Sequence, residues 1–222
     1  MSDDDLQDLG DHIGAVFDAV NKPLKGLYGD QHPFHLGTMI RWKDGGPDPL
    51  DGMSMYWNDD GYWHFVGFGL AEQGIKTSGI PEVSGWGCEL TFKLRPPPEV
   101  LADTSIDPEL NVPIPCLKTP RWPVVMLNDI ARYVFSQQAW LRHGHFMQGI
   151  QPFPFIGIIA DPSLPDPCQT PNGTFHWLQV VILDEEQFAK LQSDDWQAWL
   201  ASRPDSWHIT PDMPDPHTTV DP

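Results

Sequence analysis

The sequence predicts an α+β domain in which helices cover both faces of a β-sheet. Residues 83–94 alternate between apolar and polar side chains, a period of two that is typical of a strand with one buried face. Residues 62–70 and 174–183 are apolar or small on both faces, as expected for central strands. Apolar residues recur at helical spacing in 6–20 and 123–141. These patterns favour a layered helix–sheet–helix domain over an open, one-faced sheet.

The strand at 83–94, VSGWGCELTFKL, organises the rest of the chain. Its ends are set by Ser84-Gly85 and by three prolines at 96–98, which break regular structure. The apolar face is expected to carry Trp86, Cys88, Leu90, Phe92 and Leu94. The other face is expected to meet solvent and carries Gly87, Glu89, Thr91 and Lys93.

The remaining elements follow in order along the chain. The N-terminal helix is expected to end at Pro23 and Gly26, and a final helix covers about 185–201. Shorter strands are predicted at 36–42, 53–57, 154–160 and, at the C-terminal end, 207–210. Residues 96–120 are rich in proline and predict a long loop. We divide the chain into an N-terminal helix at 1–23, a domain at 24–210 and a loose tail at 211–222.

Charge and composition narrow the classes of partner. The chain has 31 acidic and 13 basic residues and a net charge of −18, which argues against nucleic acids and anionic membranes. A basic protein is the partner that this charge favours. The three cysteines show no CxxC spacing and predict unpaired, reduced thiols. The acidic N-terminus is unlike a secretory signal, so a cytoplasmic location is expected.

Several segments resemble the Suppressor of fused family in the order that the family shows. They are GGPDPLDGMSMYWN at 45–58, YWHFVGFGL at 62–70, VSGWGCELTFKL at 83–94, RWPVVMLNDIARYVF at 121–135 and TPNGTFHWLQVVILDEEQ at 170–187. WHITPDM at 207–213 resembles a further segment of the animal protein. Together these pieces cover most of residues 28–187.

The resemblance implies a mixed β-sheet sandwiched by helices, like the N-terminal domain of the family, and a binding role instead of catalysis. The animal protein holds a short peptide of the Gli transcription factors as an added strand between two domains. This chain matches the first domain, so the complete clamp is not expected within one chain. Single-domain members are typical of bacteria, where many resemble immunity proteins that neutralise a toxin.

The same resemblance suggests partner-binding residues. Tyr133 matches a tyrosine that lines the peptide site, whereas His145 replaces the acid of the family's Gly-Asp-His, which places Gli-type recognition in question. Trp140, expected near the end of the main helix, is a candidate interface anchor. We therefore predict Tyr133, Trp140 and His145 as the partner-binding residues of a non-enzymatic module without metal or cofactor. The partner is expected to be a basic protein such as a toxin, or else a peptide added as a strand.

An enzyme is the competing class. His143 and His145 form a close pair that a metal-dependent hydrolase could use, but no carboxylate or cysteine completes a recognisable zinc set. The chain contains no G-x-S-x-G, no phosphate-binding glycine loop and no H-E-x-x-H. His64 and His176 each neighbour a tryptophan in a central strand and are expected to be hydrogen-bonded core residues. The oligomeric state, and whether another chain supplies a second domain, are left open.

Overall fold

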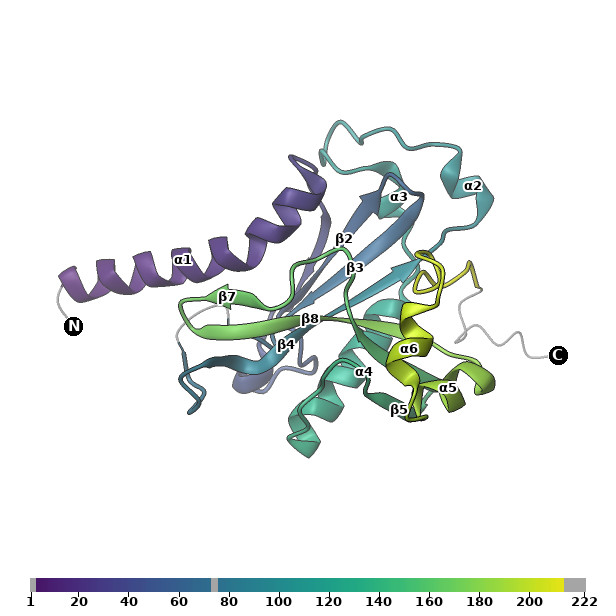
Figure 1. Ribbon diagram of the computed structural model, residues 1–222. Helices are drawn as coiled ribbons and strands as arrows, with labels where there is room; N and C mark the ends of the chain where they lie inside the picture. The colour runs from purple at the N-terminus through teal and green to yellow at the C-terminus, as the bar shows by residue number, and fades with distance from the viewer. Residues whose placement is uncertain (1–2, 73–75, 214–222) are drawn as a thin grey trace.

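A mixed β-sheet forms the centre of the molecule (Figure 1). The computed structural model describes residues 3–72 and 76–213. The sheet order is β1-β2-β3-β4-β8-β6-β5, and β7 pairs with β8. Neighbouring strands are antiparallel except β4 and β8, which are parallel. The strands are β1 Phe34–Gly37, β2 Gly52–Asn58, β3 Tyr62–Phe68, β4 Val83–Leu94, β5 Phe146–Ile150, β6 Phe153–Ala160, β7 Cys168–Thr170 and β8 Gly173–Ile182.

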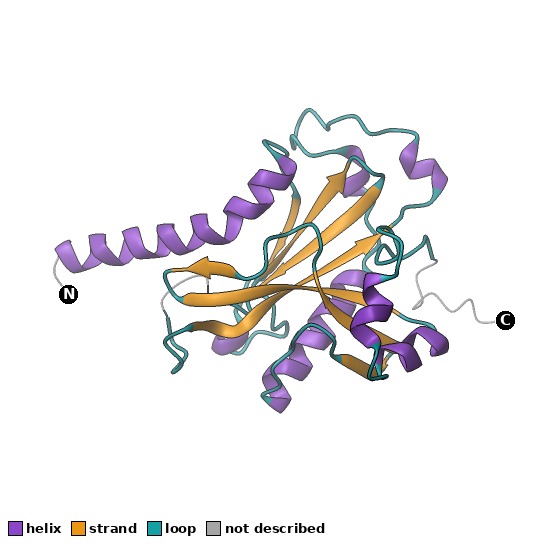
Figure 2. Ribbon diagram, in the orientation of Figure 1, coloured by secondary structure: helices purple, strands orange, loops and turns teal. Residues whose placement is uncertain are grey.

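Helices lie on both faces of this sheet (Figure 2). The helices are α1 Asp3–Tyr28, α2 Pro98–Leu101, α3 Ile114–Leu117, α4 Trp122–Gln137, α5 Glu185–Leu191 and α6 Trp196–Ala201, with a 3-10 turn η1 at Trp42–Asp44. α4 covers one face, whereas α1 and the α5–α6 pair cover the two ends of the other face. The α+β class with a mixed, helix-covered sheet is therefore confirmed.

The main core lies between α4 and the sheet. Leu127, Ile130 and Val134 of α4 pack in one buried cluster with Leu90 and Phe92 of β4. On the opposite face, Val20 and Leu24 of α1 pack against Val66, Phe175 and Trp177. Each buried side chain of this size contributes about 1.5–3 kcal/mol relative to its exposed state. Both faces of the central strands are thereby removed from water, as the patterns at 62–70 and 174–183 predicted.

The predicted solvent face of β4 is buried in the structure, so that expectation was wrong. Glu89, Thr91 and Lys93 are all 0% exposed. The alternation in the sequence correctly separated the two faces, but it could not show that a second layer covers the polar face. That layer satisfies the polar groups with hydrogen bonds and an ion pair, which is the condition for burying them.

The ends of several elements differ from the sequence predictions. α1 continues through Pro23 to Tyr28, because Leu24 is buried and the Tyr28 ring stacks on Tyr56 at 4.3 Å. The expected final helix is two helices, α5 and α6, and the loop at 96–120 contains the short α2 and α3. β5 and β7 were not predicted. The expected strand at 207–210 is a single bridge from Leu94 to Thr210, and the predicted tail beyond Met213 lies outside the described residues.

Candidate protein-docking site

Four aromatic rings line a groove of about 440 Å³ beside α4. Trp42 comes from η1, Trp86 from β4, Phe135 from α4 and Trp140 from the segment after α4. We call this hollow the aromatic groove. Its remaining lining includes Leu70, Ala71, Ile80, Arg41, Asp51 and Glu72. Tryptophan is enriched among the residues that contribute most to binding at protein interfaces, and such residues cluster around well-packed pockets.

The rings of the groove support one another by edge contacts. The Trp86 ring centroid lies 5.7 Å from that of Phe135 and 5.8 Å from that of Trp140, both in edge-to-face geometry. Trp42 approaches Phe135 from the other side, with centroids 6.2 Å apart. Such pairs contribute about 0.5–1.5 kcal/mol each beyond area burial. The rings are therefore held in position before any partner arrives.

The floor of the groove is a tight turn at the end of β3. The buried Glu89 carboxylate accepts hydrogen bonds from the backbone N–H groups of Gly69 at 2.9 Å, Leu70 at 3.2 Å and Ala71 at 3.0 Å. Gly85 packs against this turn with φ +56, and a Cβ there would lie 2.2 Å from the Leu70 carbonyl oxygen. Only glycine allows the two backbone segments to come this close.

A second carboxylate fixes the rim of the groove. Glu72 accepts hydrogen bonds from Ser78 N at 2.6 Å, Ser78 Oγ at 2.8 Å and Thr77 Oγ1 at 2.7 Å, and from Gly85 N at 3.2 Å. Burial acts to raise the pKa of Glu72, but these hydrogen bonds outweigh it and hold the pKa below its usual value. On the opposite rim, Arg41 Nε lies 4.0 Å from Asp51 Oδ2. The groove thus has an apolar interior and a charged edge, as protein interfaces do.

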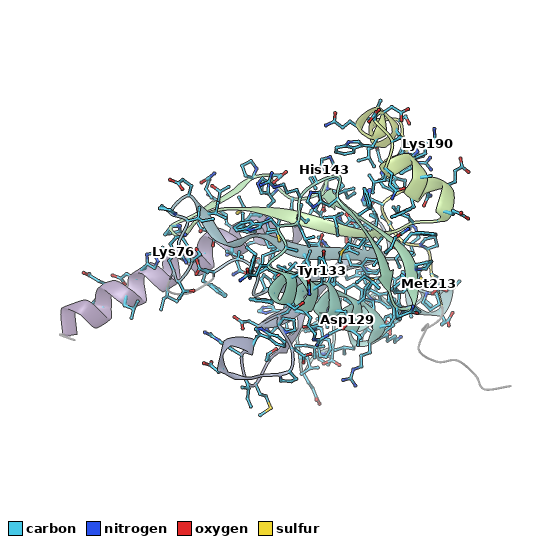
Figure 3. All side chains as sticks on the ribbon, turned by 90° about the horizontal axis from the view of Figure 1, so that it is seen from below. Lys76, Asp129, Tyr133, His143, Lys190 and Met213 are labelled. Carbon is cyan, nitrogen blue, oxygen red and sulfur yellow. The ribbon has the colours of Figure 1, made fainter. Side chains whose placement is uncertain are left out.

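The structure separates the three predicted binding residues. Trp140 lines the aromatic groove and is 38% exposed. Tyr133 is 42% exposed on α4, which faces the viewer in Figure 3 with Tyr133 and Asp129 labelled, and it is not among the described residues that line the groove. His145 is exposed and immediately precedes β5, outside the groove lining.

Sequence reasoning missed the other rings of the groove. Trp86 and Trp42 fall in the strands predicted at 83–94 and 36–42, and Phe135 falls in the helix predicted at 123–141. α4 also ends earlier than predicted, because Gln138 adopts a left-handed conformation with φ 51 and its N–H bonds to the Val134 carbonyl. Trp140 therefore leaves the helix and turns toward Trp86. Apolar periodicity does not distinguish a half-exposed ring from a buried one, so no sequence signal identified the groove.

Strand β5 is an exposed edge of the sheet. It pairs only with β6 among the described strands, and Phe146 at its start is 43% exposed. The His145 carbonyl accepts a hydrogen bond from Ile158 N at 2.8 Å, which anchors the start of the edge. A free sheet edge presents backbone donors and acceptors that an extended peptide can use.

A buried polar cluster lies on the face of the sheet opposite to α4. Asp161 bonds to Lys93 Nζ at 2.5 Å, Thr91 Oγ1 at 2.6 Å and His64 Nε2 at 3.1 Å. Tyr28 of α1 bonds to the other ring nitrogen of His64 at 2.7 Å. Burial opposes ionisation of Asp161, but His64 and Lys93 hold its pKa well below the usual range. The cluster joins α1, β3, β4 and the turn after β6.

The prediction that His64 is a hydrogen-bonded core residue is thus confirmed. The same prediction for His176 was wrong, because His176 is exposed and bonds to Asp166.

The histidine pair of the competing enzyme hypothesis does not converge on a metal site. His143 Nδ1 accepts a hydrogen bond from Ala160 N at 2.9 Å. Within residues 3–72 and 76–213, no group of three histidine, cysteine or acidic side chains is placed to hold a metal ion.

In the same residues, no helix combines the length and the apolar character that crossing a membrane requires. The cysteines Cys88, Cys116 and Cys168 are free and buried.

Comparisons with known proteins identify relatives of the chain. The family model for the Suppressor of fused protein (SUFU) matches residues 46–211. The human and mouse Suppressor of fused homologs are each 28% identical over 202 residues, which is 82% of this chain and 38% of each homolog. The chain therefore spans less than half of the length of these relatives.

Solved structures share the same fold. Drosophila Suppressor of Fused superposes with a TM-score of 0.68 and 24% identity, covering 90% of this chain and 49% of that chain. The Sufu chain of a Sufu–Fu complex superposes with a TM-score of 0.70 and 25% identity, covering 89% of both chains. The match of the family model to residues 46–211, which include strands β2 to β8 and helices α2 to α6, places this chain in the Suppressor of fused protein family.

Proposed function

We propose that this chain is a non-catalytic module that docks onto a basic partner protein through the aromatic groove. The observation that carries the proposal is the convergence of Trp42, Trp86, Phe135 and Trp140 on one preformed hollow. Trp140 is the central anchor because it is both exposed and in contact with Trp86. A rigid groove lowers the entropy lost on binding, so a partner gains most from inserting an apolar side chain there.

Two further facts support a protein partner of basic character. A homologous Sufu domain has been crystallised in complex with the protein Fu, so a domain of this fold binds another protein in at least one relative. The net charge of −18 would accelerate encounter with a positively charged protein and slow encounter with an acidic one. We infer, more specifically, that the partner is a basic toxin of a bacterial neighbour gene and that docking covers its active site.

The test is co-expression of the chain with the product of the adjacent gene, followed by co-purification and measurement of the dissociation constant. We expect a stable complex and restored growth of cells that express the toxin. Trp140→Ala should weaken binding about 30-fold or more, since truncation of an interface anchor costs about 2 kcal/mol or more. Val125→Ala is the matched control, because Val125 is 37% exposed on α4 and does not line the groove.

The outcomes test docking in the aromatic groove and the identity of the partner separately. Loss of binding in Trp140→Ala but not in Val125→Ala supports docking in the groove. Equal binding by both variants would refute the groove as the docking site. A neighbouring gene product that neither binds the chain nor harms cells would refute the toxin assignment.

A second candidate function is capture of an extended peptide by strand addition at β5, which its free edge and exposed Phe146 favour. Amide hydrogen exchange of the complex distinguishes the two modes. Strand addition would protect the backbone of Phe146–Ile150 from exchange. Docking in the groove would instead protect the indole N–H of Trp140 and leave the exchange of the β5 backbone unchanged.

A further inference from the structure

The loop between β1 and β2, residues 38–51, holds two large apolar side chains in water. It projects below α4 in Figure 3. Met39 is fully exposed and Ile40 is 55% exposed. The next two residues, Arg41 and Trp42, line the aromatic groove, so the exposed pair adjoins that groove along the chain. Single exposed apolar residues are normal at protein surfaces, whereas contiguous apolar patches mark interaction sites.

Hydrogen bonds within the loop fix its backbone. At the base, the Thr38 hydroxyl donates to the Leu50 carbonyl at 2.7 Å. Farther out, the N–H of Gly46 donates to the Arg41 carbonyl at 3.0 Å. A Cβ at Gly46 would lie 1.8 Å from the carbonyl oxygen of Ile40, so only glycine allows the two sides of the loop to come this close. The backbone that carries the exposed pair is therefore held from the opposite side of the loop.

Helix α4 anchors the loop from outside. Arg132 Nη2 donates to the Pro47 carbonyl at 3.2 Å and lies 3.8 Å from Asp48 Oδ1. The side-chain oxygen of Asn128 accepts a hydrogen bond from Leu50 N at 3.3 Å. The same helix provides one ring of the aromatic groove, so the loop and the groove share one support. A loop that is already ordered loses little conformational entropy when a partner covers it.

Charge does not decide what the loop can bind. Residues 38–51 contain two basic and three acidic residues. Arg41 is paired with Asp51, and Asp48 is paired with Arg132 of α4. The loop thus has little net charge, and apolar contact is what its two exposed side chains offer a partner.

We propose that the β1–β2 loop is a second part of the docking surface, and that the protein which fills the aromatic groove also covers Met39 and Ile40 with an apolar patch. This inference rests on the proposed function, which it extends from one groove to a continuous surface with two parts. The groove provides the anchor. The loop selects, among proteins of suitable charge, those with an apolar patch beside the inserted side chain.

The first test uses random peptides that are long enough to span both parts, displayed on phage and selected on the full chain. The tightest binder is the probe for fluorescence anisotropy. The double variant Met39→Ser/Ile40→Ser should bind it about tenfold or more weakly, since truncation of buried contacts at an interface lowers affinity. Trp140→Ala should also weaken binding, whereas Val125→Ala should not. The thermal midpoint of the double variant should match that of the unaltered chain, because both side chains are exposed.

The second test follows oxidation of methionine in the unaltered chain. Met39 is fully exposed, whereas Met53, Met55 and Met126 are at most 2% exposed and serve as internal controls. Dilute hydrogen peroxide should convert Met39 to its sulfoxide first, which mass spectrometry quantifies. Bound peptide should slow this oxidation severalfold and leave the buried methionines unchanged.

The outcomes distinguish this inference from the proposed function. Unchanged binding by the double variant, or oxidation of Met39 at the same rate in the complex, would overturn the inference. Weaker binding by Trp140→Ala would then still support docking in the aromatic groove. Unchanged binding by Trp140→Ala would refute both the groove and the two-part surface, as would a selection that yields no binding peptide.

Discussion

The Glu89 carboxylate accepts a hydrogen bond from the backbone N–H of Gly69 at 2.9 Å, although Glu89 lies in the middle of β4 and is 0% exposed. The adjoining N–H groups of Leu70 and Ala71 bond to the same carboxylate. A buried negative charge is stable here because several backbone donors surround it. This arrangement bends the chain after β3 into the floor of the aromatic groove, so a core residue determines the shape of a surface site.

Replacement of Glu89 by glutamine should therefore destabilise the protein and weaken binding in the groove. The amide NH₂ of glutamine would face a backbone N–H instead of accepting from it. Loss of a charge-assisted acceptor predicts a decrease of about 1–3 kcal/mol in the free energy of unfolding, measured by urea denaturation. Glu82→Gln is the control, since Glu82 is exposed. A stability of Glu89→Gln equal to that of the control would mean that the turn does not depend on the carboxylate.

Replacement of Gly85 by alanine should disturb the same floor from the other side. The left-handed φ of +56 costs a residue with a side chain about 1–2 kcal/mol, and the added Cβ would meet the Leu70 carbonyl. We expect a lower thermal midpoint and weaker partner binding. Gly79→Ala should change the free energy of unfolding by less than about 0.5 kcal/mol, because nothing lies within 4 Å of its Cβ position. Similar midpoints for the two variants would contradict the close approach.

Substitutions of the buried residues Lys93 and Asp161 should have non-additive effects on the free energy of unfolding. Lys93→Met leaves the Asp161 charge buried without its ammonium partner and should lower the free energy of unfolding by about 3–5 kcal/mol. The double variant Lys93→Met/Asp161→Asn removes both charges and should be less destabilised than the sum of the single variants. Additive effects in this double-mutant cycle would show that the two side chains do not depend on each other.

Stability should decrease as the pH falls from 7 to 5. Burial lowers the pKa of His64 below its usual value and lowers that of His208 to about 4. A histidine in the unfolded chain has a pKa near 6.5, above its pKa in the folded protein. At pH values between these two pKa values only the unfolded chain binds the proton, so protonation favours unfolding. Urea midpoints measured at intervals across this window should decline. In His208→Gln the decline should be smaller, and an unchanged pH slope in that variant would show that His208 does not contribute.

Much of the architecture could be predicted from local patterns. The alternation at 83–94 matches the bounds of β4, and the two-sided strands at 62–70 and 174–183 occupy central positions. The helix predicted at 123–141 corresponds to α4, in which Leu127, Ile130 and Val134 are buried. These features depend on side-chain periodicity, which burial of one or both faces imposes directly on the sequence. The edge strands β5 and β7 were missed because short, exposed strands carry little periodicity.

The candidate site was predicted only in part. Trp140 was identified and lines the aromatic groove, but Trp42 was predicted only as part of a strand, and Trp86 and Phe135 were expected to be buried. Their role depends on where α4 ends and on how closely Gly85 approaches Leu70. The spacing of neighbouring residues in the sequence determines neither the end of α4 nor the approach of Gly85 to Leu70.

The order of strands and helices, the apolar faces and the acidic charge of the chain were fixed by residue type and period, because these properties act over a few positions. Tertiary structure alone decided that Glu89 and Lys93 are buried and that Trp140 contacts Trp86. Each of these depends on segments distant in the chain coming into contact, and contact between distant segments determines which polar groups find partners and which rings remain exposed.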